Sequence, residues 1–148
     1  MAKKRHRIEN CACLNLRAAA RMVTQHYDHQ FRAVGLRSTQ FNLLAAVKDA
    51  GPVSMTRLAD ILGMDRTTLN RDLKPLLRDG LVRVKKGRDR RVRLVSLTKV
   101  GKTKVRAGFP IWRRLQDQLH EGMGKKHWKS LRKELSRTSH VVGTERDR

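Results

Sequence analysis

The hydrophobic period of the chain changes at Gly80, and this change constrains the fold more than any other feature. Before it, "DRTTLNRDLKPLLRDG" (65–80) carries leucines at helical spacing, and Asp65 stands where a helix N-cap is expected. After it, valines alternate with basic residues in "LVRVKKG" and again in "RRVRLVSL", on either side of the turn "GRDR". The pattern predicts an amphipathic helix followed directly by a β-hairpin.

Before residue 65 the periodicity is helical. A long helix is predicted over 9–34, a second over about 39–50, and a short third helix between a Ser54 N-cap and Gly63. A glycine turn joins this third helix to the helix over 65–80, and this arrangement predicts a helix-turn-helix. The hairpin directly after them makes it a winged one.

Two more helices are predicted after the hairpin, from Thr98 to about residue 120 and over about 125–138, and the tail beyond is expected to be frayed. The fold class is therefore mainly α, with a small β component (α+β): a winged helix-turn-helix with further helices on both flanks. At 148 residues the chain is long enough for about one domain with a buried core.

Charge is the outlying property of the composition. The chain has 35 Lys and Arg against 13 Asp and Glu, a formal net charge of +22, which favours a polyanionic partner. A membrane is not expected, because no basic stretch is strongly amphipathic and no apolar run approaches the roughly 20 residues that span a bilayer. No signal peptide is recognised at the start. Cys11 and Cys13 are too close for an unstrained disulfide, which indicates a reducing cytoplasm.

The helix over 65–80 has a polar face that suits the major groove of double-stranded DNA. Removing the leucine stripe leaves five outward side chains: Arg66, Thr67, Asn70, Arg71 and Lys74. Arginine can bond a guanine edge with two N–H groups, asparagine can bond an adenine edge, and threonine can touch a thymine methyl or a phosphate. The helix is therefore expected to read base sequence as well as to bind phosphate.

These residues resemble the MarR family of bacterial transcription regulators over roughly residues 9–138. The hairpin and its exit, "GRDRRVRLVSLTKVG", are similar to the family's D-x-R wing followed by a strand and L-T-x-x-G, and "DRTTLNRDLKPLLRDGLV" looks like its recognition helix. The resemblance implies a wing pair of Asp89 and Arg91, in which the carboxylate would hold the guanidinium ready for the minor groove. Arg88 and Arg90 are then expected to bind phosphates.

The resemblance also implies a single domain over 1–148 that acts as a homodimer, with a repressor as the expected role. Residues 36–98 are the DNA-binding lobe, and the helices within 9–35 and 99–138 are the dimerisation region. The apolar side chains of these helices are too many for a single small lobe to bury. This favours a dimer independently of the resemblance. Two-fold symmetry would present two recognition helices to a pseudo-palindromic operator, with half-sites about one helical turn apart.

A sequence-indifferent, nucleoid-like nucleic-acid-binding protein is the alternative, and the net charge supports it as well. An enzyme is not expected, because no Ser-His-Asp set, phosphate loop or HExxH motif appears. No cofactor or metal is expected. Cys11, Cys13, His26 and His29 lie on one predicted helix, and because residues 13 and 26 are about 20 Å apart, one chain cannot close a tetrahedral site with all four. A site between two chains stays open.

Two kinds of signal are considered for release from DNA. As in many proteins of the family, a small aromatic effector is expected where the helical region meets the DNA-binding lobe, with Phe41 and Trp112 as lining residues. The other signal is oxidation, because "IENCACLNLRAAARMVTQHY" resembles the first helix of the organic-hydroperoxide-sensing branch, in which a cysteine at the Cys13 position is oxidised.

The match to that branch is incomplete around the cysteine. Tyr27 stands where the branch has a tyrosine bonded to the cysteine, but Arg17 and Ser38 replace two further tyrosines. Arg17 lies one helical turn beyond Cys13, and its charge and the positive N-terminal end of the helix both favour the reactive thiolate. Cys11 is the candidate resolving thiol, through a bond across the dimer.

Overall fold

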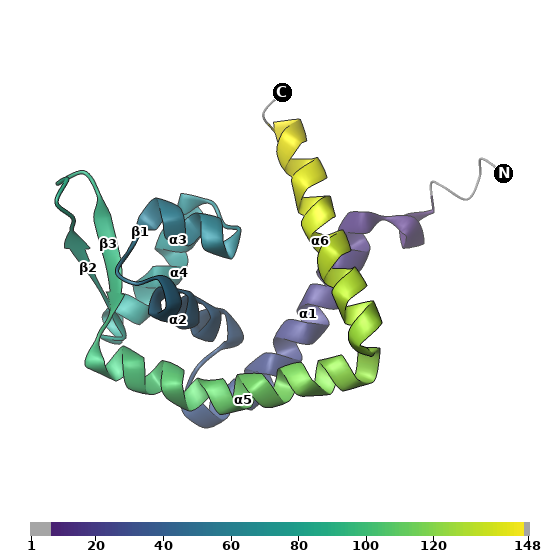
Figure 1. Ribbon diagram of the computed structural model, residues 1–148, viewed down its shortest axis with the longest axis horizontal. Helices are drawn as coiled ribbons and strands as arrows, with labels where there is room; N and C mark the ends of the chain where they lie inside the picture. The colour runs from purple at the N-terminus through teal and green to yellow at the C-terminus, as the bar shows by residue number, and fades with distance from the viewer. Residues whose placement is uncertain (1–6, 147–148) are drawn as a thin grey trace. The chain divides into compact units, whose positions relative to one another are not determined.

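The computed structural model describes residues 7–146, which fold into two compact units that divide between Ile111 and Trp112. The helices are α1 (Ala12–Phe31), α2 (Ser38–Ala50), α3 (Met55–Leu62), α4 (Arg66–Arg78), α5 (Lys99–Met123) and α6 (Lys125–Arg146). The strands are β1 (Val53–Ser54), β2 (Val82–Lys86) and β3 (Arg93–Leu97) (Figure 1). The predicted class, mainly helical with a small sheet, is confirmed.

The first predicted helix is interrupted near its start. Ile8–Asn10 form a turn of 3-10 helix, Cys11 is extended, with φ −71° and ψ 118°, and α1 begins only at Ala12. At the other end α1 passes into a second 3-10 turn, Arg32–Val34, which Gly35 ends in the left-handed conformation at φ 64°. The prediction that one helix covers 9–34 and carries both cysteines is therefore wrong at its N-terminal end.

The C-terminal helix is longer than its sequence predicted. The sequence predicts a helix over about 125–138 and a frayed tail, but α6 continues to Arg146. All of its side chains from Lys129 to Gly143 are exposed within this one chain. The expectation for the last two residues, 147 and 148, lies outside the described residues.

β3 is the central strand of the sheet, with the order β1-β3-β2 (Figure 1). β2 pairs antiparallel with β3 from Val82↔Leu97 to Lys86↔Arg93, which is the predicted hairpin. β1 pairs with the same strand through Val53↔Val95. Because β1 ends directly before α3, this pairing joins the start of the helix-turn-helix to the base of the hairpin.

Three phenylalanine rings form the centre of the first unit. Phe41 stacks on Phe31 with the ring centroids 4.7 Å apart, and Phe109 meets Phe41 edge-on at 5.4 Å. A Cβ at Gly108 would lie 2.6 Å from the Phe41 ring, so only glycine lets the α5 backbone approach this closely. The helices that precede and follow the DNA-binding lobe are thus fixed to α2 by aromatic packing.

A threonine and a glycine fix the exit from the hairpin. The Thr98 hydroxyl donates to the Gly80 carbonyl at 2.6 Å and accepts from the Gly101 N–H at 3.0 Å, so it caps α5. A Cβ at position 101 would overlap the Leu81 carbonyl. These contacts explain the threonine and the glycine of "LTKVG": together they start α5 against Gly80 and Leu81, the residues that follow α4.

Candidate nucleic-acid interface

Two capped helices and a glycine turn place α4. The Ser54 hydroxyl accepts from the Arg57 N–H at 3.2 Å and begins α3, and Gly63 ends that helix at φ 62°. Asp65 then caps α4, since its two carboxylate oxygens accept from the Thr68 N–H and the Thr68 hydroxyl, both at 2.8 Å. These bonds, the backbone bond most of all, lower the pKa of Asp65 below its ordinary value.

The leucine face of α4 is buried and its polar face is exposed. Leu69, Leu73 and Leu76 are buried, with relative exposures of at most 1%. Leu77, whose spacing from Leu73 predicts that it belongs to the same stripe, is instead 41% exposed. The five predicted base-reading residues are all exposed: Arg66, Thr67, Asn70, Arg71 and Lys74. The separation of faces is the one that docking a helix into a groove requires.

A cavity of about 420 Å³ lies beside the polar face of α4. Arg71 lines it and has its Nε 3.5 Å from the Asp72 carboxylate. The start of α2 contributes Arg37, and the end of α4 contributes Arg78. Sequence reasoning missed these two arginines, because only the fold brings the two helices together at this point, and neither residue belongs to a local pattern.

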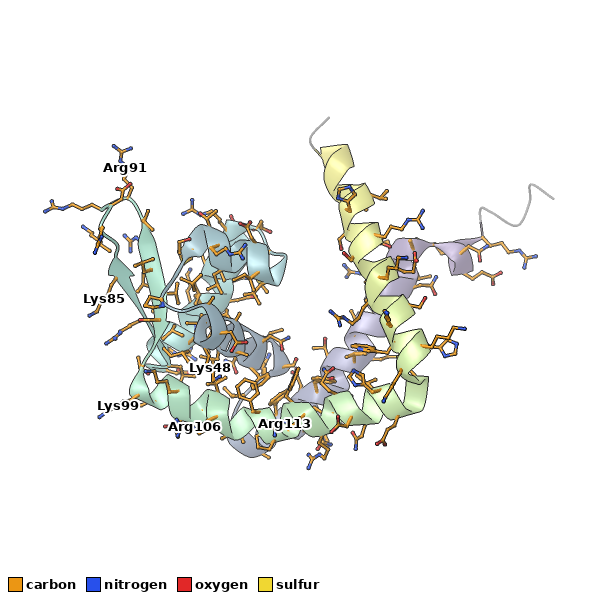
Figure 2. The ribbon with its side chains drawn as sticks, viewed as in Figure 1. Lys48, Lys85, Arg91, Lys99, Arg106 and Arg113 are labelled. Atoms are coloured by element: carbon orange, nitrogen blue, oxygen red, sulfur yellow. The ribbon has the colours of Figure 1, made fainter. Side chains whose placement is uncertain are left out.

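The wing tip is ordered by backbone hydrogen bonds and by one side chain. Gly87 N–H donates to the Val92 carbonyl at 2.8 Å, and Val92 N–H donates to the Asp89 carbonyl at 2.9 Å. The Asp89 carboxylate accepts from the backbone N–H of Arg91 at 2.9 Å. The expected bond between this carboxylate and the Arg91 guanidinium is therefore wrong. Asp89 orders the tip through the main chain, and Figure 2 shows the Arg91 side chain directed away from the sheet.

All four predicted wing residues are at the hairpin tip and exposed: Arg88, Asp89, Arg90 and Arg91. They follow β2, whose solvent-facing positions Arg83 and Lys85 are basic as well. The wing tip and the polar face of α4 both belong to the first compact unit. One lobe therefore offers a helix and a hairpin tip that are each strongly basic.

The candidate thiols stand at the start of α1. Cys11 is its extended N-cap and half-buried, whereas Cys13 lies in the first turn and is exposed, and both are free thiols. Arg17 is also exposed, one turn along the helix. Tyr27 is buried near the other end, 14 positions from Cys13, which is about 21 Å along a helix. Within one chain Tyr27 thus cannot bond Cys13.

Ser38, where the peroxide-sensing pattern has a tyrosine, has a local role. Its N–H and hydroxyl both donate to Asp28 Oδ1, at 2.7 and 2.6 Å, which fixes the start of α2 against α1. Phe41, the first predicted effector-lining residue, is only 1% exposed and packs in the aromatic centre. Trp112 is half-buried and belongs to the second unit. A pocket lined by both stays a prediction.

In the part of the chain that the structure describes, no three His, Cys, Asp or Glu side chains come together as a metal-binding group. Within residues 7–146, no helix is long and apolar enough to cross a membrane.

The first unit thus contains a winged helix-turn-helix, the fold of a class of transcriptional regulators. A family model described as the MarR family matches residues 34–92, which run from the end of the 3-10 turn after α1 to the wing. The chain belongs to the MarR family of transcriptional regulators.

Individual relatives agree with this assignment. One is the M. tuberculosis transcriptional regulator MosR, whose crystal structure was solved in complex with DNA. Its sequence is 36% identical to this one, and the two structures match with a TM-score of 0.84 over 92% of this chain and 98% of MosR. The repressor CouR, bound to a 23-mer DNA duplex, is 26% identical, with a TM-score of 0.75 over 91% of this chain and 96% of its own.

A curated relative matches over a shorter stretch. It is the uncharacterized HTH-type transcriptional regulator YwoH of Bacillus subtilis, 30% identical over 86 residues, or 58% of this chain. The matched stretch spans 63% of the length of YwoH, which is less than two thirds of it.

Proposed function

We propose that the protein is a sequence-specific repressor of transcription that binds double-stranded DNA in the cytoplasm as a homodimer. The observation that carries the proposal is the pairing, in one compact unit, of a capped helix with an exposed polar face and an ordered, exposed basic hairpin tip. A helix and a hairpin with these properties suit the major and the minor groove respectively.

Each set of side chains has its own part in binding. Asn70 and Arg71 on α4 have the donors and acceptors that discriminate base edges. Lys74 and Arg88 bind phosphates and carry no sequence information. Arg91 enters the minor groove, because its backbone is held at the ordered tip while its guanidinium extends away from the sheet (Figure 2).

The DNA-bound relatives support this arrangement. MosR was solved in complex with DNA, and its fold matches nearly the whole of this chain. A homodimer is supported by apolar side chains exposed on α1 and α6 of the single chain: Leu14, Leu16, Met22, Val23, Leu131, Leu135, Val141 and Val142. Several large apolar side chains exposed on one helix are a feature of protein interfaces, and each of these two helices has them. We place a second copy of the chain there and expect a pseudo-palindromic operator.

Release from DNA follows either a small aromatic effector or oxidation of Cys13. The thiol alternative is supported by the exposure of Cys13 in the first turn of α1, close to the positive end of the helix. Since Tyr27 is too far along α1 to act within one chain, a tyrosine bonded to the thiol would have to come from the second copy.

The test is selection of duplexes from a random pool, followed by affinity measurements on the selected and the scrambled sequence. We expect a preference of about 10³ or more for the selected duplex. Arg91→Ala should weaken binding, whereas the control Arg32→Ala, which removes the same charge from the 3-10 turn after α1, should not. Asn70→Ala should alter base preference by about 1–3 kcal/mol.

Equal affinity for the selected and scrambled duplexes would favour the sequence-indifferent alternative. Lys74→Ala provides the internal comparison, because loss of a phosphate contact should weaken all sequences alike and lower the salt slope by about 1. If Asn70→Ala and Lys74→Ala have the same uniform effect, α4 does not read bases.

A further inference from the structure

A second basic site lies at the base of the wing, away from the tip. It is a cavity of about 380 Å³ lined by residues of α2, β2, β3 and α5, all within the first compact unit. Four cationic side chains line it: Lys48, Arg83, Lys102 and Arg106. Figure 2 labels Lys48 on α2 and Arg106 on α5. No carboxylate is among its lining residues.

Three of these cations make no ion pair within residues 7–146. The Lys48 ammonium lies 3.6 Å from the Asp49 carboxylate and 4.9 Å from the centre of the Phe109 ring. Among the described residues, none forms an ion pair with Arg83, Lys102 or Arg106. Lys102 and Arg106 are four positions apart on α5 and thus share one face of the helix. Like charges around one cavity repel each other, and an anion would relieve that repulsion.

The Arg83 side chain is already held in place by a hydrogen bond. It stands opposite Ser96 in the β2–β3 register, and its Nε donates to the Ser96 hydroxyl at 3.1 Å. This bond fixes the guanidinium through one donor and leaves the two terminal NH₂ groups for a ligand. Fixing a long side chain before binding lowers the entropy cost of the complex.

The cavity also has an apolar part. Val47 and Leu97, which are 1% and 7% exposed, contribute to its wall together with Pro52. Its volume is within the roughly 300–1,000 Å³ typical of small-molecule sites. A purely inorganic anion would leave this wall without contacts, whereas an organic anion would cover it.

We propose that the cavity binds a small organic phosphate monoester. A monoester carries about −1.5 to −2 charges at pH 7 and three strong acceptor oxygens. It would therefore balance most of the charge of Arg83, Lys102 and Arg106, and a single carboxylate would not. Guanidinium groups bond phosphate through paired N–H groups, and the apolar wall receives the organic part.

A DNA backbone phosphate fits the position less well. Arg83 precedes Arg88 by five residues, which is about 16 Å along a strand, so a tip in the minor groove leaves this cavity well outside the groove. The apolar wall of the cavity would also stay without contacts if a phosphate of a duplex occupied it. The occupant is thus a small molecule, and its binding does not depend on the DNA-binding function proposed above.

The test is calorimetric titration of the full-length protein with phenyl phosphate in a phosphate-free buffer. We expect saturable binding of one molecule per chain, at least about tenfold tighter than binding of benzoate, which has the same ring and one charge. Arg106→Gln and Arg83→Gln should each weaken the affinity about tenfold. Arg113→Gln, on the same helix and exposed but outside the cavity lining, should leave it unchanged.

Several outcomes would overturn the proposal. These are no saturable binding, equal affinity for phenyl phosphate and benzoate, or equal loss in Arg106→Gln and Arg113→Gln, which would mean diffuse attraction. Circular dichroism of each variant establishes that it is folded. If Arg106→Gln keeps phenyl phosphate binding but loses duplex affinity as Arg91→Ala does, the cavity faces nucleic acid instead.

Discussion

Replacement of Asp89 should affect DNA binding differently depending on what replaces it. The carboxylate makes one hydrogen bond, to the Arg91 N–H at 2.9 Å, and adds a negative charge to the tip that we propose enters the minor groove. Asp89→Ala removes both the bond and the charge. Asp89→Asn removes the charge but keeps an oxygen that can accept from the same N–H. The two variants therefore separate order from electrostatics.

The magnitudes follow from that geometry. A hydrogen bond of this kind contributes a net of about 1 kcal/mol, so loss of tip order in Asp89→Ala should weaken binding about fivefold relative to Asp89→Asn. Removal of a negative charge near phosphates favours binding, so Asp89→Asn should bind as tightly as the wild type or more tightly. The assay is fluorescence anisotropy of a labelled duplex at several salt concentrations, with circular dichroism to establish folding.

Equal affinities of the alanine and asparagine variants would refute this reasoning. In that case the bond to the Arg91 N–H does not order the tip for binding, and the aspartate acts through its charge alone. A loss in Asp89→Asn as large as that in Arg91→Ala would restore the role that the sequence predicted, a carboxylate acting on the guanidinium.

Four further predictions concern other parts of the chain. Leu135→Glu on α6 should shift the protein from dimer to monomer in sedimentation, whereas Leu77→Glu on α4 should not, although both leucines are 41% exposed in the single chain. Stoichiometric peroxide should release DNA from the wild type and not from Cys13→Ser, and equal release from both would exclude this thiol as the sensor. Gly101→Ala should destabilise the fold by about 1–3 kcal/mol in urea unfolding, because its Cβ meets the Leu81 carbonyl and neither backbone segment can easily move. Asp65→Ala should lower the urea midpoint at pH 6, and the difference from wild type should shrink at acid pH. The carboxylate's contribution is complete above its ordinary pKa of 3.8 and is lost as the pH falls through the lower folded value.

Features of the lobe that depend on local bonds could be predicted from the sequence. Ser54, Gly63 and Asp65 were identified as helix ends, and each makes the bond or adopts the backbone angle that its position requires. The exposed face of α4 followed from the leucine spacing alone. These predictions succeed because a cap or an amphipathic stripe is encoded within a few neighbouring residues.

Features that depend on distant contacts could not be predicted. β1 has only two residues, too few for a period, and exists because Val53 pairs with Val95 far along the chain. Arg37 and Arg78 come together only when α2 and α4 pack. The Asp89 error has another cause, since a D-x-R spacing is compatible with a bond to either the main chain or the side chain, and only coordinates distinguish the two.

The position of β2 in the sheet has a consequence for how the molecules behave in solution. Within residues 7–146 this strand pairs with β3 alone, so its other edge presents main-chain groups that could recruit a strand from another molecule. Arg83, Lys85 and Lys86 occupy three of its five positions, and their mutual repulsion discourages two such edges from meeting. Neutralising them to reduce unspecific attraction to DNA would therefore also remove a protection against aggregation. Solubility and nucleic-acid affinity are therefore coupled at this edge through the same three basic side chains.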